Sequence, residues 1–363
     1  MDLFSESTRR NPYPVYARLR AAGPVQHLPE PDLWLALSYD AVKRVLHDHA
    51  SFSSNVGPTR SVQFEWLLFM DPPRHTELRG LISRVFTSRS IAALEPRIRE
   101  ISRTLLADAG DDIDLVADYA SPLPMMVIAE MLGLPSTDWP MFARWSEAIV
   151  NLGNTIGGTD TEAASRAFAA ADAEMTAYLA DRAHTALMAR LAEAELTPSE
   201  VVRFCQLLIA AGTETTTNLI SNAMISFAEH PEARERIPDA IEEVLRHRTP
   251  VQAMFRATRT DTELAGVRIP AGRMVIACIG SANRDPAVFA DPDRFDASRD
   301  PNPHIAFGHG IHYCLGAPLS RLEAKIALPD LLARFPRFEV ERDWRPRGSF
   351  HVHGPAALRV RPV

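Results

Sequence analysis

The chain has 363 residues, 46% of them hydrophobic and 23% charged, and its formal net charge is −7. Its basic residues are scattered and form no block, so nucleic acid is not an expected partner. No window approaches the roughly 20 apolar residues that a membrane span needs. The first residues have neither the basic nor the apolar part of a secretion signal. We therefore expect a cytoplasmic protein without a membrane anchor.

Helical periodicity dominates the chain as far as residue 248. The predicted elements of the first half are a helix over 15–22, strands over 25–27 and 33–37, a helix from Asp40, and helices from 71–73 to about 194. Between 51 and 70 no period is clear, which is typical of a loop over a binding site or of an exposed connection.

The next predicted helix covers 198–229 and is unusually long. Thr197 is placed to cap it, and at about 1.5 Å per residue it would span roughly 48 Å. A helix of that length must cross the whole molecule. Another helix should end near Arg248.

After Pro250 the pattern changes to short β segments, and then to an irregular stretch over 285–316 that is rich in Pro, Asp, Gly and His. A last long helix is predicted over 318–335. No linker composition separates domains, so we expect one domain over 1–363. Its predicted class is mainly α (α+β), with a helix-rich part and a smaller β-sheet part.

The irregular stretch ends in a glycine-rich segment, 307–316, that contains Cys314. Glycines allow tight turns, and the following helix would place its positive end near the sulfur, which favours thiolate over thiol. Such a thiolate would be a metal ligand or a nucleophile. A buried structural cysteine, or a zinc site with His309 and His312, remains an alternative at this point. Cys205 and Cys278 lie far away, so no disulfide framework is indicated and a reducing compartment fits.

This segment resembles the haem-binding signature of the cytochrome P450 family, F-x-x-G-x-[H/R]-x-C-x-G. The matching residues are Phe307, Gly310, His312, Cys314 and Gly316. The resemblance implies the cytochrome P450 fold, one haem b and Cys314 as the axial iron ligand. It also implies that His312 pairs with a haem propionate.

Other family positions occur in order along the chain. Glu243 and Arg246 form an i,i+3 pair that would ordinarily be a surface contact. By resemblance they match the E-x-x-R motif, and Arg294 matches the arginine that joins it in a buried structural triad. His75, Arg79 and Arg256 match further propionate partners, which the resemblance therefore adds to the cofactor-binding set.

The centre of the long helix reads Ala211-Gly212-Thr213-Glu214-Thr215-Thr216. Gly and Thr are poor helix formers, so a run of them suggests a functional reason, such as a hydroxyl bonded to the carbonyl four residues earlier. The run resembles the family's acid–alcohol pattern. Glu214 and Thr215 are then the expected catalytic pair, which delivers protons during oxygen activation beside a widened helical turn.

The resemblance implies a monomeric monooxygenase that uses O₂ and two electrons. No flavin or nicotinamide motif is fused to the chain, so the expected electron source is a separate ferredoxin or flavodoxin with its reductase. The expected substrate is a small or medium apolar molecule, such as a natural-product intermediate of secondary metabolism. A peroxide-driven peroxygenase and a non-catalytic haem-binding sensor are the alternatives.

The regions beside the substrate entrance are the least defined part of the sequence. The chain is short for the family, and 178–197 looks trimmed between two helices. The expected pocket lining is Phe64, Leu207, Ala210, Ala211, Ala253, Met254 and Val352.

Overall fold

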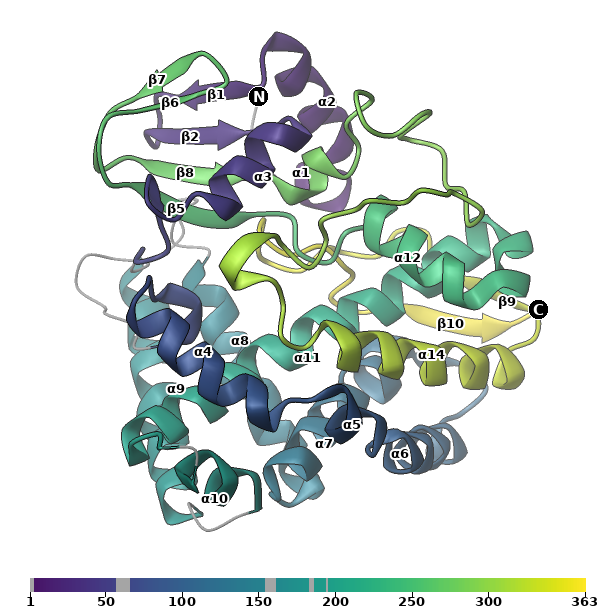
Figure 1. The fold of residues 1–363 in the computed structure, drawn as a ribbon. Coiled ribbons are helices and arrows are strands. Elements are labelled where there is room, and N and C mark those ends of the chain that lie inside the picture. Colours follow the sequence, from purple (N-terminus) through teal and green to yellow (C-terminus); the bar gives the residue numbers. More distant parts are fainter. Residues whose placement is uncertain (1–2, 57–65, 154–160, 183–185, 194) are drawn as a thin grey trace.

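The structure is a computed structural model that describes residues 3–56, 66–153, 161–182, 186–193 and 195–363. Helices make up most of it and a smaller β portion lies at one end (Figure 1). The predicted class, mainly α with a minor β part, is confirmed. The helices are α1 (Glu6–Arg10), α2 (Tyr13–Ala22), α3 (Tyr39–His47), α4 (Arg74–Val85), α5 (Ser88–Ala92), α6 (Glu95–Asp108), α7 (Pro122–Leu132), α8 (Trp139–Gly153), α9 (Thr161–Asp181), α10 (Ala186–Glu193), α11 (Pro198–Glu229), α12 (Ile237–His247), α13 (Ile279–Ala282) and α14 (Ala317–Arg334).

The strands form one larger sheet and two smaller ones. They are β1 (Val25–Leu28), β2 (Leu33–Ala36), β3 (Phe52–Ser53), β4 (Ile113–Asp114), β5 (Met254–Thr258), β6 (Thr262–Leu264), β7 (Val267–Ile269), β8 (Met274–Ala277), β9 (Phe338–Val340) and β10 (Arg359–Pro362). The larger sheet has the order β1-β2-β8-β5-β3. The predicted strand pair near the N-terminus is present as the antiparallel β1 and β2, and β8 lies parallel to β2.

The long helix α11 runs through the interior, as its sequence predicted. The Thr197 side chain accepts a hydrogen bond from the backbone N–H of Glu200, whose side chain bonds back to Thr197, and this capping box fixes the start of the helix. Most of its side chains are buried because α7, α8, α9, α12 and α14 all contact it. Gly212 permits the closest approach, since a Cβ there would lie 2.9 Å from the Cδ1 of Ile128 on α7.

The glycine-rich segment 307–316, which we call the cysteine segment, lies between the helical part and the larger sheet (Figure 1). It contains a short 3₁₀ turn, η6 (Gly310–His312), which contacts α3, and it leads directly into α14. Separate apolar clusters fill the helical part and the sheet side, so the segment lies at the junction of two packed layers.

Two regions with weak sequence signals have short elements. Within 51–70, β3 and the 3₁₀ turn η1 (Leu67–Phe69) are formed, while 57–65 lies outside the described residues. The end of α9 and all of α10 occupy most of the trimmed 178–197 region. Among the helices of the described residues, none is both long and apolar enough to cross a membrane.

Candidate active site

A largely apolar cavity of about 410 Å³ lies beside α11. Its wall includes Thr215 from α11, Ala253 from the segment before β5, and Cys314 from the cysteine segment. Leu207, Ala210, Ala211, Met254 and Val352, which the sequence predicted as pocket lining, line the same cavity, as does Ala253. Phe64, the remaining predicted lining residue, lies outside the described residues.

The backbone of the cysteine segment is shaped to hold the sulfur at this wall. Gly310 has φ +75°, and a Cβ there would lie 2.9 Å from the carbonyl oxygen of Leu46, so only glycine fits. The Cys314 N–H donates to the Phe307 carbonyl at 2.9 Å and closes the loop. Gly316 follows the sulfur closely, with its Cβ position 3.8 Å from the Cys314 Sγ.

Opposing effects act on the pKa of the Cys314 thiol in the polypeptide without haem. Burial raises the pKa of the Cys314 thiol, and the opposing effects of the Gly316 and Ala317 N–H groups and of Arg79 are smaller. The start of α14 does favour the thiolate, as predicted, but desolvation outweighs it. The polypeptide alone therefore keeps a thiol here, and a bound cation would be needed to stabilise the thiolate.

Cys314 differs from the other two cysteines in its surroundings. Cys205 and Cys278 are buried away from the cavity, and burial raises the pKa of each to about 12. Within the described parts of the chain, no group of three or more His, Cys, Asp or Glu residues could hold a metal ion. The zinc alternative with His309 and His312 therefore has no geometric support.

Four basic side chains, those of His75, Arg79, Arg256 and His312, lie close together at the cysteine segment. The rings of His75 and His312 contact each other at a tilt of 51°, with a centroid distance of 4.2 Å, and Arg256 adds positive charge beside His312. The Arg79 guanidinium donates to the Tyr313 carbonyl at 2.6 Å. The His312 Nε2 lies 2.9 Å from the Ser54 hydroxyl.

Several of these groups have no partner for their polar atoms. Both ring nitrogens of His75 and one terminal nitrogen of Arg256 are buried without a hydrogen bond to any residue that the structure describes. Burial and then Arg256 lower the pKa of His312 to about 3, burial and then Arg79 lower that of His75, and burial lowers the pKa of Arg256 to about 10. An anionic group placed among them would satisfy these atoms and reverse the shifts. The propionates of haem fit this position, next to a sulfur and an apolar cavity.

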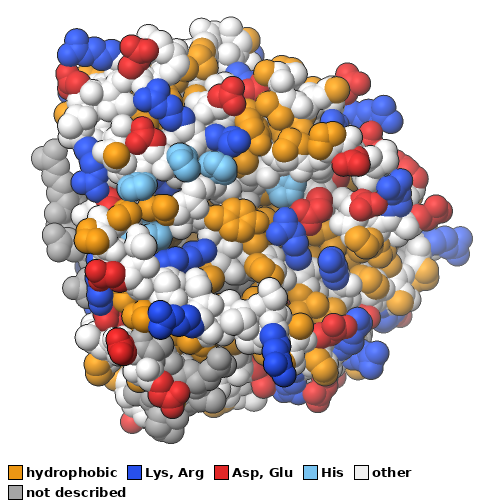
Figure 2. All heavy atoms as spheres, viewed as in Figure 1, with side chains coloured by type: hydrophobic (Ala, Val, Ile, Leu, Met, Phe, Trp, Pro, Cys, Tyr) orange, Lys and Arg blue, Asp and Glu red, His pale blue; other side chains and the backbone are white. Residues whose placement is uncertain are grey.

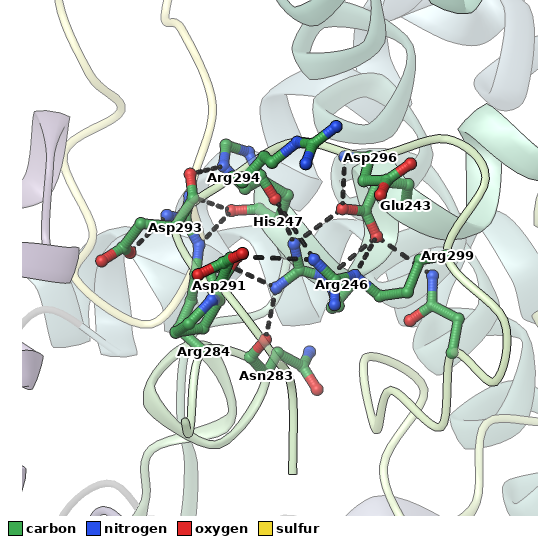
Figure 3. Close-up of polar contacts among 12 residues, drawn as sticks. Glu243, Arg246, His247, Asn283, Arg284, Asp291, Asp293, Arg294, Asp296 and Arg299 are labelled. Carbon is green, nitrogen blue, oxygen red and sulfur yellow. Dashed lines mark hydrogen bonds and ion pairs between the residues drawn. The ribbon is translucent and has the colours of Figure 1, made fainter. Parts of the chain in front are cut away.

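The predicted structural triad is present, with a different third arginine (Figure 3). Arg246 binds both carboxylate oxygens of Glu243, at 2.8 and 2.7 Å, and neither side chain is exposed to solvent. The third guanidinium is that of Arg299, whose Nε lies 3.5 Å from the Glu243 carboxylate. The prediction of Arg294 was wrong, because its side chain is exposed and only its carbonyl takes part, by accepting from Arg246 at 3.0 Å.

The acid and alcohol of α11 lie at the cavity wall. The Thr215 hydroxyl donates to the Ala211 carbonyl at 3.0 Å, which is the bond expected four residues earlier, yet α11 stays α-helical through this segment rather than widening. Glu214 is buried, and its carboxylate lies 2.9 Å from the Nε of Arg347. Burial raises the pKa of Glu214, and the positive charge of Arg347 opposes this effect.

Comparison with known proteins agrees with this geometry. The Cytochrome P450 family profile matches residues 237–352. The chain is 41% identical to the putative cytochrome P450 YjiB of Bacillus subtilis over 97% of this chain and 94% of the relative. It is also 43% identical to the erythromycin C-12 hydroxylase of Saccharopolyspora erythraea, over 86% and 84%. The chain belongs to the cytochrome P450 family.

The structure resembles solved cytochromes P450 over its whole length. CYP109E1 from Bacillus megaterium, solved in complex with testosterone, superimposes with a TM-score of 0.90 at 38% identity, covering 98% of this chain and 99% of the other. The protein is therefore a cytochrome P450 monooxygenase, and the family's cofactor is haem b.

A second ion-pair network in this cytochrome P450 holds the cysteine segment and was not predicted. Arg321 on α14 donates two hydrogen bonds of 2.7 Å to Glu242, and the His304 ring lies 3.0 Å from the same carboxylate. Burial acts to raise the pKa of Glu242, but these bonds outweigh it and lower the pKa to about 2. The Arg321 guanidinium also lies 4.4 Å from the Phe307 ring centre. Adjacent residues of α12 thus fix the loop before Cys314 and the helix after it.

A second buried acid also escaped the sequence analysis. Glu323 on α14 lines the cavity, and one of its oxygens is buried without a partner in the described part of the chain. Burial raises its pKa to about 8, and a hydrogen bond with Thr216 opposes this effect only in part. No motif marked Glu323, because its burial arises only from the packing of α14 against α11.

The arginine assignment can be tested with two matched substitutions. Arg299→Met should destabilise the protein by roughly 1–3 kcal/mol, because it removes one cation from a buried carboxylate. Arg294→Met should change stability by less than about 0.5 kcal/mol, since it leaves the carbonyl that accepts from Arg246 in place. Thermal unfolding of the two haem-loaded variants measures the difference. Equal losses would contradict the assignment.

The buried acid predicts a pH dependence of stability. The folded-state pKa of Glu323 is about 8 against an ordinary 4.5, so folding favours the protonated form. This stabilisation is fully present below pH 4.5 and is lost as the pH rises towards 8. Relative to wild type, Glu323→Gln should therefore gain on the order of 4 kcal/mol between those pH values.

The measurement is denaturant unfolding of both proteins across this pH range, with the exposed Glu341→Gln as control. A difference between wild type and Glu323→Gln that does not vary with pH would rule out the raised pKa.

Proposed function

We propose that this cytochrome P450 inserts one oxygen atom from O₂ into a small or medium apolar substrate, such as a natural-product intermediate. The observation that carries the proposal is one cavity that brings together the Cys314 sulfur, the basic side chains of Arg79, Arg256 and His312, and the Glu214–Thr215 pair. The rest of the cavity wall is formed mainly by apolar side chains. They favour apolar ligands because binding removes the apolar surface of the ligand from water.

The residues that would hold haem follow from their positions. Cys314 is the proposed iron ligand, and Phe307 and Gly316 shape the backbone around its sulfur. His75, Arg79, Arg256 and His312 are the proposed propionate partners, each adding charge-assisted hydrogen bonds. When bound, haem supplies the redox chemistry of oxygen activation.

The proposed catalytic pair moves protons through a largely apolar site. Glu214 and Thr215 both line the cavity, and the Glu214 carboxylate is paired with Arg347. Burial raises the pKa of Glu214 towards the range in which a carboxyl can both take up and release a proton. This intact acid–alcohol pair favours a monooxygenase over the peroxygenase and sensor alternatives.

The proposed electron source is a separate ferredoxin or flavodoxin with its reductase. The proposed state of the cytochrome P450 is a monomer. Figure 2 shows the face over the cysteine segment, where His side chains and several Lys or Arg side chains lie, with Asp and Glu side chains interspersed towards α14. An acidic redox protein would be attracted to the basic side chains of such a surface.

The relatives support an apolar, oxygen-bearing substrate. One is named as an erythromycin hydroxylase, and a structural neighbour holds testosterone. Testosterone combines a large apolar body with few oxygen atoms, which suits the mainly apolar cavity described above.

The ligand assignment is tested by cysteine substitutions. The ferrous carbon monoxide complex of the wild type should show the long-wavelength Soret band that cysteinate ligation gives. Cys314→Ala should lose this band, whereas Cys205→Ala and Cys278→Ala should retain it because neither residue lines the cavity. Loss of the band in either control variant would show that the ligand is misassigned.

The proton pathway is tested by coupling efficiency. Thr215→Ala should bind haem and substrate almost normally but divert electrons to hydrogen peroxide, because the proton-donating hydroxyl is gone. Glu214→Gln should slow oxygen activation by roughly 10²–10⁴-fold, the usual range for a lost positioned proton transfer. Product and peroxide formed per reduced cofactor are the measurement. Wild-type coupling in Thr215→Ala would mean that protons take another route.

A further inference from the structure

One polar side chain on the cavity wall is not explained by haem binding or by proton transfer. His351 lines the cavity and follows the buried Trp344 in the chain. The segment that contains His351 packs beside the segment before β5. The Gln252 N–H donates to the His351 carbonyl at 2.8 Å, and Val251 and Val352 form an antiparallel bridge. The backbone of His351 is therefore fixed against the cavity-lining segment 250–254.

The imidazole ring is held on one side only. Its Nδ1 lies 2.5 Å from the hydroxyl of the buried Ser349, and the rings of Phe255 and Phe350 pack edge-on at 6.0 and 6.1 Å. Its Nε2 has no partner among the residues that the structure describes, and the ring is partly accessible at the cavity wall. One polar atom of a fixed ring is thus available to a bound molecule.

The hydrogen bonds around Ser349 select the tautomer. The Ser349 oxygen already accepts from the His351 N–H at 3.4 Å, and its only other described partner is the His351 Nδ1. If Nδ1 carried the ring proton, the buried hydroxyl hydrogen would have no acceptor. The hydroxyl therefore donates to Nδ1, and Nε2 carries the proton. Burial lowers the pKa of His351 to about 4, so the ring is neutral at pH 7.

Most polar groups of α11 and α14 at the cavity are committed elsewhere, whereas Glu323 of α14 keeps one oxygen without a partner among the described residues. The Thr215 hydroxyl donates within its own helix, and the Thr216 hydroxyl donates to Ser320 at 3.1 Å. Glu214 is held by Arg347. On the wall formed by 250–255 and 351–352, the lining side chains other than His351 are apolar. Gln252 belongs to this segment but does not line the cavity.

We propose that the Nε2–H of His351 donates a hydrogen bond to an acceptor oxygen, a ketone or ester carbonyl, on an otherwise apolar substrate. This positions the substrate by one polar contact while the remaining wall excludes water. The inference rests on the proposed monooxygenase function and adds the class of substrate. His351 is a positioning residue, and Ser349 sets its tautomer.

The test uses matched ligands that differ by one carbonyl. Cyclododecanone is compared with cyclododecane, and 5α-androstan-17-one with 5α-androstane, by titrating the haem spin-state shift of the haem-loaded protein. The ratio of hydrocarbon Kd to ketone Kd is compared between wild type and variants, which cancels the different hydration of the two ligands. The variants are His351→Phe, Ser349→Ala, the possible rescue His351→Gln, and Val352→Ala as a lining control.

His351→Phe should lower the ratio about threefold to tenfold for at least one pair, as expected for one lost hydrogen bond. Ser349→Ala should lower it less, and His351→Gln should restore part of it because the amide can donate. Val352→Ala should weaken the ketone and the hydrocarbon alike. An unchanged ratio in His351→Phe, or a wild type that binds neither ketone, would overturn the proposal.

Two further readouts separate this inference from the proposed function. The carbon monoxide spectrum of each variant shows whether the cysteinate haem is intact. An intact spectrum with an unchanged ratio refutes the role of His351 alone, whereas a missing band refutes the function. Nitrogen-15 NMR of the diamagnetic ferrous carbon monoxide state checks the tautomer, and a proton on Nδ1 would also overturn the proposal.

Discussion

The buried ion pair between Glu243 and Arg246 is the contact on which the position of the sulfur depends. Arg246 also donates to the carbonyls of Asn283 and Pro292, at 3.0 and 2.8 Å, and Glu243 accepts from the Asp296 N–H at 2.8 Å. The pair therefore satisfies the backbone of an irregular stretch that has no sheet or helix to do so. Burying both charges is costly unless every polar atom is matched, and here the loop backbone supplies the matches.

On the side of the cysteine segment where His75 and Arg256 lie, buried polar atoms are not all matched. There His75 and Arg256 have buried nitrogens without hydrogen-bond partners among the described residues, which costs free energy in the polypeptide alone. Binding of an anionic cofactor would remove that cost, so the folded state should gain stability from haem beyond its apolar contacts. The polar groups around Glu243 and Arg246 are paired within the polypeptide, whereas those of His75 and Arg256 would be paired by the bound cofactor.

Sequence reasoning succeeded where a local pattern determines the structure. The bounds of α11 agree with the prediction because proline in the first turn, the Thr197 cap and the helix length are all local signals. The cysteine segment was also found, since its glycines are required by backbone geometry at Gly310.

The failures concern features that tertiary packing decides. Arg294 and Arg299 lie in the same loop, and no periodicity tells which guanidinium turns inward towards Glu243. The polarity of the helix that follows Cys314 can be read from the sequence, whereas the depth of burial, which raises the Cys314 pKa in the polypeptide alone, cannot. His351 was missed although its neighbour Val352 was predicted, because its tautomer depends on Ser349 and its exposure on the bridge to Val251.

The C-terminal segment 345–354 connects the two functions of the cavity. Arg347 holds the acid Glu214, and four residues later His351 faces the substrate space. The segment closes onto α11 because Gly354 has no side chain, since a Cβ there would lie 2.2 Å from the Oδ1 of Asn218. Any movement of this segment therefore changes the cation beside the proton-transfer acid and the donor beside the substrate together. Substrate positioning and proton transfer are thus mechanically linked through a short loop that carries no recognised motif.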